Sequence, residues 1–158
     1  MFNVGDNISH PMHGAGVVID IVERFVDNRP KSFYLVNMAY GSMTVLIPCN
    51  CCESIGVRYI ITAQRAEEII QSIPSLSIEI NDNWSKRYRE NIERIKSGDL
   101  ITVACVIKSL VLRDKVKTLS TGERKLLNTA KGILLSELAL ATQSNVRDME
   151  RRFMDLII

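Results

Sequence analysis

The sequence lacks any long hydrophobic segment. Its longest apolar run, ITVACVI at residues 101–107, is far shorter than the roughly 20 residues that a membrane-spanning helix needs. The first residues, MFNVGDNISHP, contain neither the basic start nor the apolar stretch of a secretory signal. We therefore expect a cytoplasmic protein that makes no membrane contact.

Cysteine and histidine are also scarce, with four and two residues respectively. Three cysteines form the cluster CNCC at residues 49–52, whereas a zinc site usually pairs two separated clusters. Cys105 lies in an apolar helical pattern and supplies no second cluster, so ordinary thiols are favoured over zinc. His10 and His13 have no carboxylate or third ligand nearby, which favours structural histidines in a turn. We expect no metal and no cofactor.

The features that usually mark an enzyme are missing as well. We find no nucleophile with an adjacent base, no glycine-rich phosphate loop and no paired carboxylates that stand out from chance. A reactive thiol in the CNCC cluster would need a lowered pKa, which nothing in the sequence indicates. We therefore expect a binding protein.

What is present divides the chain into two halves. Residues 1–60 contain runs rich in β-branched and aromatic residues, separated by turn-forming sequences such as DNRPK and YGS. Five short strands joined by tight turns predict a small, strongly bent sheet or barrel. After residue 61 the apolar residues recur with helical spacing. The predicted fold class is α+β: a small β-domain over 1–60, followed by an all-α helical domain over 61–158.

The helical half has clear boundaries. A linker helix is expected over 62–73, where Pro74 ends it, and a bundle over about 81–157. Asp99 is a candidate helix cap. Ser120 and Glu123 in STGE have the spacing of a capping box, which predicts a long helix from there to about Ala141.

Positive charge is concentrated in the middle of the chain. Residues 77–125 contain 11 Lys and Arg against 7 Asp and Glu, whereas residues 1–60 contain 4 against 5. Such a concentration is typical of a nucleic-acid surface, although a solvated helical face gives the same pattern.

Within this basic region lies the only tryptophan, Trp84, in the segment NDNWSKRYREN. Helical spacing places it in line with Tyr88, Ile92 and Ile95, which favours a core position. Its place in the first turn, with basic residues on both flanks, favours a side chain that contacts DNA. Spacing alone leaves both interpretations open.

Several motifs resemble the CarD/CdnL family of bacterial transcription regulators. They are FNVGDNISHPMHGAGVV, YLVNMAYGSMTVLIP, NWSKRYRENIERIKSGD and LSTGERKLLNTAKGILLSELALA, and the resemblance runs from about residue 2 to 142. The first motif alone also resembles the RNA-polymerase-interacting domain of transcription-repair coupling factor. Its combination with NWSKRY and LSTGE is specific to CarD/CdnL.

The resemblance implies a Tudor-like five-stranded domain that binds the RNA polymerase β subunit, partly by strand pairing at an exposed edge. It also implies a helical domain that contacts promoter DNA without sequence specificity, at the upstream fork of the open complex. The residue matching the family's minor-groove wedge is Trp84. The implied phosphate contacts are Lys86, Arg87, Arg89, Arg124 and Lys125, and the implied polymerase contacts are Arg24 and the strand segment Val45, Leu46 and Ile47.

One position departs from the family pattern. Many relatives carry an arginine where this chain has Leu46, so we expect packing and backbone pairing to replace an ion pair there. We expect a monomer, with dimerisation through the free strand edge left open. The alternative function is a protein-interaction adaptor with a β-module and a helical module but no DNA contact.

Overall fold

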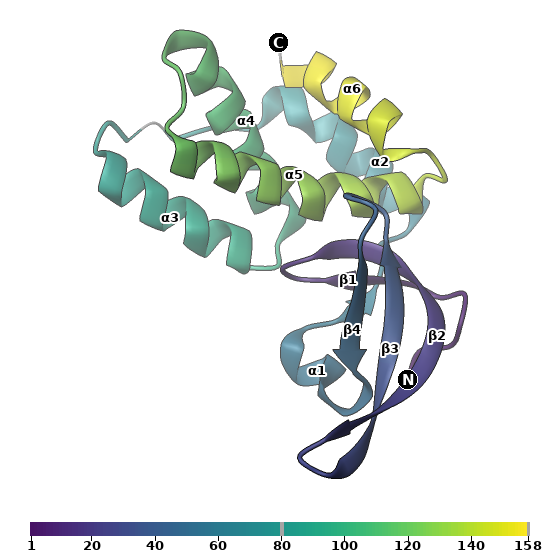
Figure 1. The fold of residues 1–158 in the computed structure, drawn as a ribbon. Helices are drawn as coiled ribbons and strands as arrows, with labels where there is room; N and C mark the ends of the chain where they lie inside the picture. The colour runs from purple at the N-terminus through teal and green to yellow at the C-terminus, as the bar shows by residue number, and fades with distance from the viewer. Residues whose placement is uncertain (80, 158) are drawn as a thin grey trace.

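The computed structural model describes residues 1–79 and 81–157. Figure 1 shows a strongly bent antiparallel sheet at the N-terminal end and a group of helices at the other. The strand order is β4-β3-β2-β1-β5. The strands are β1 (Asn7–His10), β2 (Gly14–Val26), β3 (Arg29–Met38), β4 (Thr44–Pro48) and β5 (Arg58–Tyr59).

The longest strands, β2 and β3, form a hairpin that extends beyond the rest of the sheet (Figure 1). Its turn residues Asp27 and Asn28 both have positive φ, the conformation that a tight turn between twisted strands requires. The register shifts between Val18 and Asp20, so this strand bends over the core. The five strands are confirmed, but two of them are long. Only Asp27 and Asn28 of the DNRPK segment form the turn, and its last three residues, from Arg29, already belong to β3.

The β-domain has its own core, which includes Ile8, Val18, Tyr34 and Ile47. Directly after β4, the first three residues of the CNCC segment form one turn of 3-10 helix, η1 (Cys49–Cys51). The last residue of that segment begins the short helix α1 (Cys52–Ile55). These turns were not predicted, because four residues are too few to show helical periodicity.

The helical part agrees closely with the predicted boundaries. Its elements are α2 (Ala63–Ser72), the 3-10 turn η2 (Ile73–Ser75), α3 (Trp84–Lys96), α4 (Leu100–Val116), α5 (Thr121–Ala141) and α6 (Val146–Ile157). Asp99 occupies the N-cap position of α4, but its carboxylate accepts from the Thr102 hydroxyl rather than from a backbone N–H. None of the described helices is long and apolar enough to cross a membrane.

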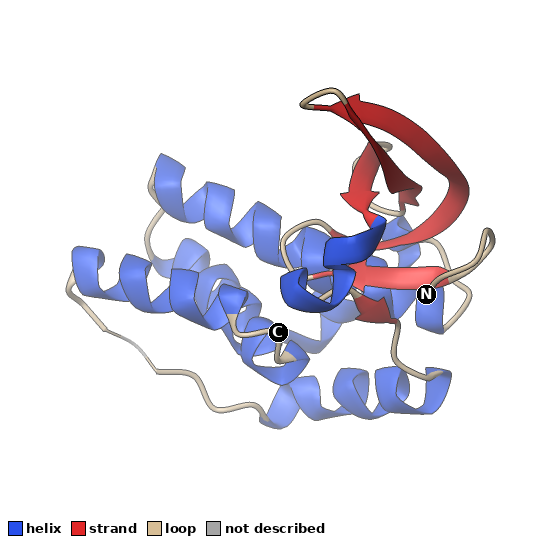
Figure 2. Ribbon diagram, turned by 90° about the horizontal axis from the view of Figure 1, so that it is seen from below, coloured by secondary structure: helices blue, strands red, loops and turns tan. Residues whose placement is uncertain are grey.

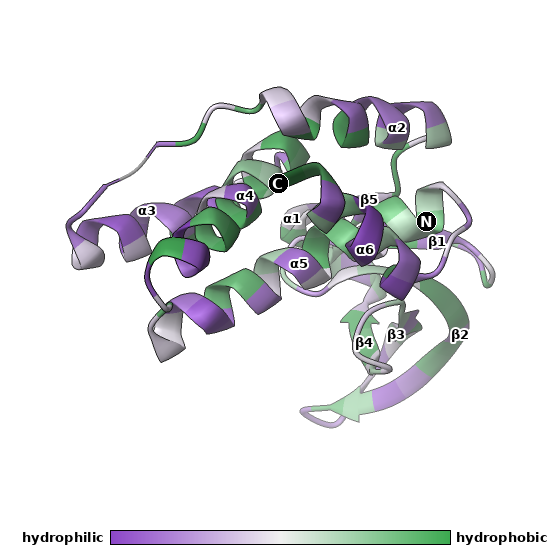
Figure 3. Cartoon of the chain, turned by 90° about the horizontal axis from the view of Figure 1, so that it is seen from above, coloured by the Kyte–Doolittle hydropathy of each residue, from purple (hydrophilic) through white to green (hydrophobic). Residues whose placement is uncertain are grey.

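A second, larger core fills the space between the helices. Figure 3 shows that α4 is largely hydrophobic, whereas α3 is mostly hydrophilic. The linker after η2 is anchored by the buried Lys108 of α4. The Lys108 Nζ donates to the backbone oxygens of Ile73, Pro74 and Leu76, at 2.8, 3.1 and 2.9 Å.

Helix α5 also packs against strands β1 and β2 of the sheet. Figure 2 shows, from below, the strands lying against the group of helices. The Ser136 hydroxyl accepts from the Ala15 N–H at 2.8 Å. Glu137, fully buried, accepts two hydrogen bonds from Arg58 and one from the Ile61 N–H. The sheet and the bundle are therefore held together by specific polar contacts that are buried or partly buried.

Candidate nucleic-acid interface

The site forms where the N-termini of α3 and α5 meet. Asn83 caps α3 by accepting from the Lys86 N–H at 3.1 Å, and Ser120 caps α5 by accepting from the Glu123 N–H at 3.2 Å. The predicted capping box is half formed: Ser120 caps as expected, but the Glu123 side chain binds Arg87 instead of turning back to the cap. The two helix starts place Trp84 beside Ser120.

The Trp84 side chain lies at the surface, 45% exposed. Its Nε1 donates to Ser120 Oγ at 3.1 Å, and its ring stacks on Tyr88, with centroids 5.0 Å apart and an interplanar angle of 13°. The core position that helical spacing favoured is therefore wrong. Along this stripe, exposure falls from Trp84 through the partly buried Tyr88 and Ile92, and the first fully buried residue is Ile95.

Four of the five predicted phosphate contacts are exposed basic side chains. Lys86 and Arg89 lie on α3, and Arg124 and Lys125 lie on the first turn of α5. Arg124 also donates to Asp114 at 2.9 Å. That carboxylate accepts from the Leu119 N–H, and this bond, followed by the Arg124 contact, lowers its pKa. Arg124 is thereby tied to the connection between α4 and α5.

Arg87 is the fifth predicted contact, and its position differs from that expectation. Its side chain is only 7% exposed and forms a bidentate ion pair with Glu123, at 2.8 and 3.0 Å. Its Nη1 donates to the backbone oxygen of Asn81 at 2.8 Å. Arg87 therefore holds α3, α5 and the end of the linker together, with its guanidinium occupied by protein groups. The sequence alone could not distinguish Arg87 from its exposed neighbours, because the partner that buries it, Glu123, lies 36 residues away in the chain.

The buried ion pair sets the charge of Glu123. Hydrogen bonds from Arg87 lower the pKa of this carboxyl, against the effect of burial. The charges of Arg87 and Arg113 and the nearby Trp84 indole lower this pKa further. Glu123 therefore stays ionised and, through Arg87, holds the N-terminal ends of α3 and α5 together.

The predicted polymerase contacts lie on the sheet and divide between its two faces. The register pairs Leu46 with Leu35 and Ile47 with the buried Tyr34. Leu46, 42% exposed, therefore points outward, and strand alternation puts the exposed Arg24 on the same face. Ile47 is buried in the β-domain core, and Val45 packs against that core while staying partly exposed, so it is chiefly their backbone that is available to a partner. Strand β4 is an edge of the sheet.

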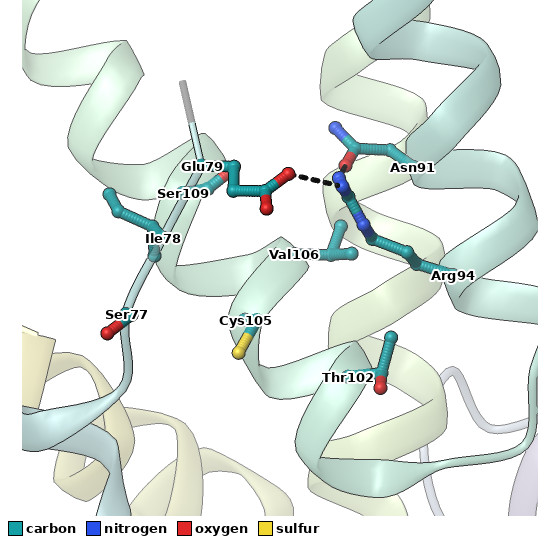
Figure 4. A pocket seen from close by; sticks show the side chains of 9 residues that line it. All are labelled: Ser77, Ile78, Glu79, Asn91, Arg94, Thr102, Cys105, Val106 and Ser109. Atoms are coloured by element: carbon teal, nitrogen blue, oxygen red, sulfur yellow. Dashed lines mark hydrogen bonds and ion pairs between the residues drawn. The ribbon is translucent and has the colours of Figure 1, made fainter. Parts of the chain in front are cut away.

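A shallow pocket of about 220 Å³ lies away from Trp84, between the linker, α3 and α4. Figure 4 shows Arg94 reaching across it to Glu79 and to the Asn91 amide oxygen. Cys105 lines the same pocket, and burial raises the pKa of its thiol, which makes it a poor nucleophile. Among the described residues, no group of three or more His, Cys, Asp or Glu side chains could hold a metal ion.

The histidine pair is part of a turn. His10 Nδ1 accepts from the backbone N–H groups of Met12 and His13, at 3.0 and 3.3 Å. Burial and the neighbouring His13 lower the pKa of His10. A neutral ring is what these two accepted hydrogen bonds require.

The chain matches two sequence families, one for each half. Residues 2–61 match the CarD-like/TRCF RID domain. Residues 68–154, more than half of the chain, match the CarD C-terminal domain. The chain belongs to the CarD family.

A curated member of comparable length supports this CarD assignment. YdeB of Bacillus subtilis (strain 168), described as a candidate transcription factor, is 33% identical over 138 residues. The alignment covers 87% of this chain and 90% of YdeB. The family is one of transcription factors, so regulation of transcription is the general role that the comparisons support.

Proposed function

We propose that this CarD-family protein binds the RNA polymerase β subunit through its β-domain and stabilises the open promoter complex by placing Trp84 in the minor groove at the upstream fork. The observation that carries the proposal is the half-exposed indole, 45% accessible, on a surface of exposed basic side chains. The exposed cations Lys86, Arg89, Arg124 and Lys125 would hold the DNA backbone. Arg87 is assigned to the scaffold.

The effect requires only differential binding. A ligand shifts an equilibrium by the difference in its affinity for the two states. Stacking of an aromatic side chain on a base contributes about 1 to 3 kcal/mol, which corresponds to a roughly 5- to 150-fold shift toward the open complex. Phosphate contacts carry no base information, and minor-groove edges are degenerate, so we expect binding without sequence preference.

The β-domain supplies the tether in this proposal. Its likeness to the CarD-like/TRCF RID domain supports polymerase as the partner. The free edge of β4 can extend a sheet of that partner, while Leu46 and Arg24 on the outer face add apolar contact and charge. Tethering raises the local concentration of the helical domain at the promoter, where weak contacts to DNA then suffice. Such a factor acts in the cytoplasm, where a bacterial polymerase works.

The test is the lifetime of a promoter open complex formed with polymerase and either the wild-type protein or Trp84→Ala. We expect the substitution to shorten the lifetime toward that of polymerase alone, with binding to polymerase unchanged. The matched control is Val116→Ala, which truncates another exposed apolar side chain of the helical domain. An unchanged lifetime with Trp84→Ala would leave the adaptor without DNA contact as the better account.

A further inference from the structure

We propose that Ser120 and Tyr88 are positioning residues that fix the plane of the Trp84 ring and leave one indole face open. The inference rests on the proposed function and specifies its binding chemistry. A ring with one free face stacks on a single base at the end of a duplex, whereas a ring inserted between two bases needs both faces.

The first support is the hydrogen bonding of the Ser120 hydroxyl. Its oxygen accepts from Trp84 Nε1 at 3.1 Å and from the Glu123 N–H at 3.2 Å. A hydroxyl oxygen has two acceptor positions, and both are used here. Because Ser120 is the N-cap of α5, its oxygen is fixed by the helix, and the indole on α3 is tied to a different rigid element.

The second support is the ring stack. Tyr88 lies one turn after Trp84, nearly parallel to it, and covers one indole face. Tyr88 is itself confined by α5, because a Cβ added to Gly122 would lie 3.2 Å from its ring and 3.8 Å from the Trp84 ring. A small residue at position 122 therefore lets α5 pack against the edge of the stack.

Together these contacts restrict both side-chain torsions of Trp84. A flexible indole would lose rotamer freedom when it bound DNA, and that loss weakens binding. An indole that is already held loses little. The uncovered face, with a ring 45% exposed, is then presented in one orientation.

The test uses the fluorescence of Trp84, the only tryptophan in the chain, in the free protein. We expect Ser120→Ala to increase the amplitude of fast local depolarisation, and Ser120→Thr, which keeps the acceptor, to match the wild type. Thr62→Ala removes the equivalent cap of α2, far from the indole along the chain, and controls for the loss of a helix cap. Equal depolarisation in Ser120→Ala and the wild type would overturn the role of Ser120.

The open face is tested separately by acrylamide quenching. Tyr88→Leu should raise the quenching constant of Trp84, because the second face becomes accessible; an unchanged constant would overturn the one-faced ring. In open complexes, Ser120→Ala should shorten the lifetime about 2- to 10-fold, and Ser120→Thr should not. If Ser120→Ala increases the depolarisation of Trp84 but Trp84→Ala leaves the open-complex lifetime unchanged, then the positioning role of Ser120 holds and the proposed function fails.

Discussion

Glu123 accepts hydrogen bonds from both Nε and Nη2 of Arg87, at 2.8 and 3.0 Å, and both side chains are buried. The pair joins the first turns of two helices that are 36 residues apart in the chain. Because one member also binds the Asn81 carbonyl, the same guanidinium fixes where the linker enters α3. The proposed DNA surface thus rests on a buried ion pair between α3 and α5.

The Glu123→Gln variant should be destabilised by about 3 to 5 kcal/mol at neutral pH, because it leaves the Arg87 charge buried without a counter-ion. Urea unfolding followed by circular dichroism measures this loss. The matched control is Glu68→Gln, which breaks an exposed pair with Arg65 and should cost less than about 1 kcal/mol. A loss no larger than that of the control would contradict a structural role for the pair.

The same pair predicts a pH dependence of stability. In the folded state the pKa of Glu123 lies below the ordinary value of 4.5, so folding favours the ionised carboxylate. The contribution is complete above the ordinary value and is lost as the pH falls through the folded pKa. The stability difference between wild type and Glu123→Gln should therefore be constant near neutral pH and shrink in acid. A difference that grows on acidification would refute this sign.

The buried Glu137 predicts how firmly the two halves are joined. Glu137→Gln removes the charge opposite Arg58 and one of the oxygens that accept its hydrogen bonds. Because the Arg58 side chain is 42% exposed and can be solvated, we expect a loss of about 1 to 3 kcal/mol, the cost of an unsatisfied buried polar group. Hydrogen exchange at the Ile61 amide, which donates to the same carboxylate, should become faster. The control Glu67→Gln breaks the exposed pair with Arg152 and should change the stability by less than about 1 kcal/mol. Unaltered exchange at Ile61 would show that the halves are held by other contacts.

Gly14 predicts a steric limit at the same junction. An added Cβ would lie 2.5 Å from Ser136 Oγ and 2.6 Å from the Gly132 oxygen, and the residue has a φ of +84°. Gly14→Ala should therefore cost more than Gly5→Ala, where φ is +97° but nothing lies within 4 Å. We expect about 1 kcal/mol for the backbone term alone and a further 1 to 3 kcal/mol for the clash, by thermal unfolding. Equal losses of stability in the two variants would show that α5 shifts to accept the added Cβ without cost.

The outer face of the sheet predicts the strength of polymerase binding. Arg24→Glu should weaken binding to an isolated β-lobe fragment by about tenfold, and the effect should decrease at high salt. Leu46→Ala should weaken it by a salt-independent factor, since an apolar contact is lost. Thr44→Ala, a smaller change on the same strand as Leu46, is the control for the Leu46 variant. If binding to the fragment persists undiminished in the Arg24 variant, that arginine lies outside the contact.

Much of this fold could be predicted from the sequence, because local patterns carry it. The α5 boundaries follow from the Ser120 cap and the helical spacing up to Ala141. The candidate site was less accessible. Trp84 shares the spacing of core residues, and only its place in the first turn indicates exposure. Arg87 has the same local surroundings as Lys86 and Arg89, and its burial depends on Glu123, which no local pattern pairs with it.

Long-range contacts account for the remaining differences. Glu137 occupies an apolar stripe of α5, which predicts only that something must neutralise it, and Arg58 of the β-domain is that partner. The side-chain alternation of β4 could have shown that Val45 and Ile47 face inward, had the position of the core relative to the strand been known.

The linker between η2 and α3 is held at its two ends by side chains that bind its backbone. Lys108 binds carbonyl oxygens up to Leu76, and Arg87 binds that of Asn81. Every amino acid has the same backbone carbonyl, so neither set of hydrogen bonds depends on which residues the linker contains. Across related proteins, the linker should therefore accumulate substitutions readily, while the lysine and the arginine that hold it should be retained.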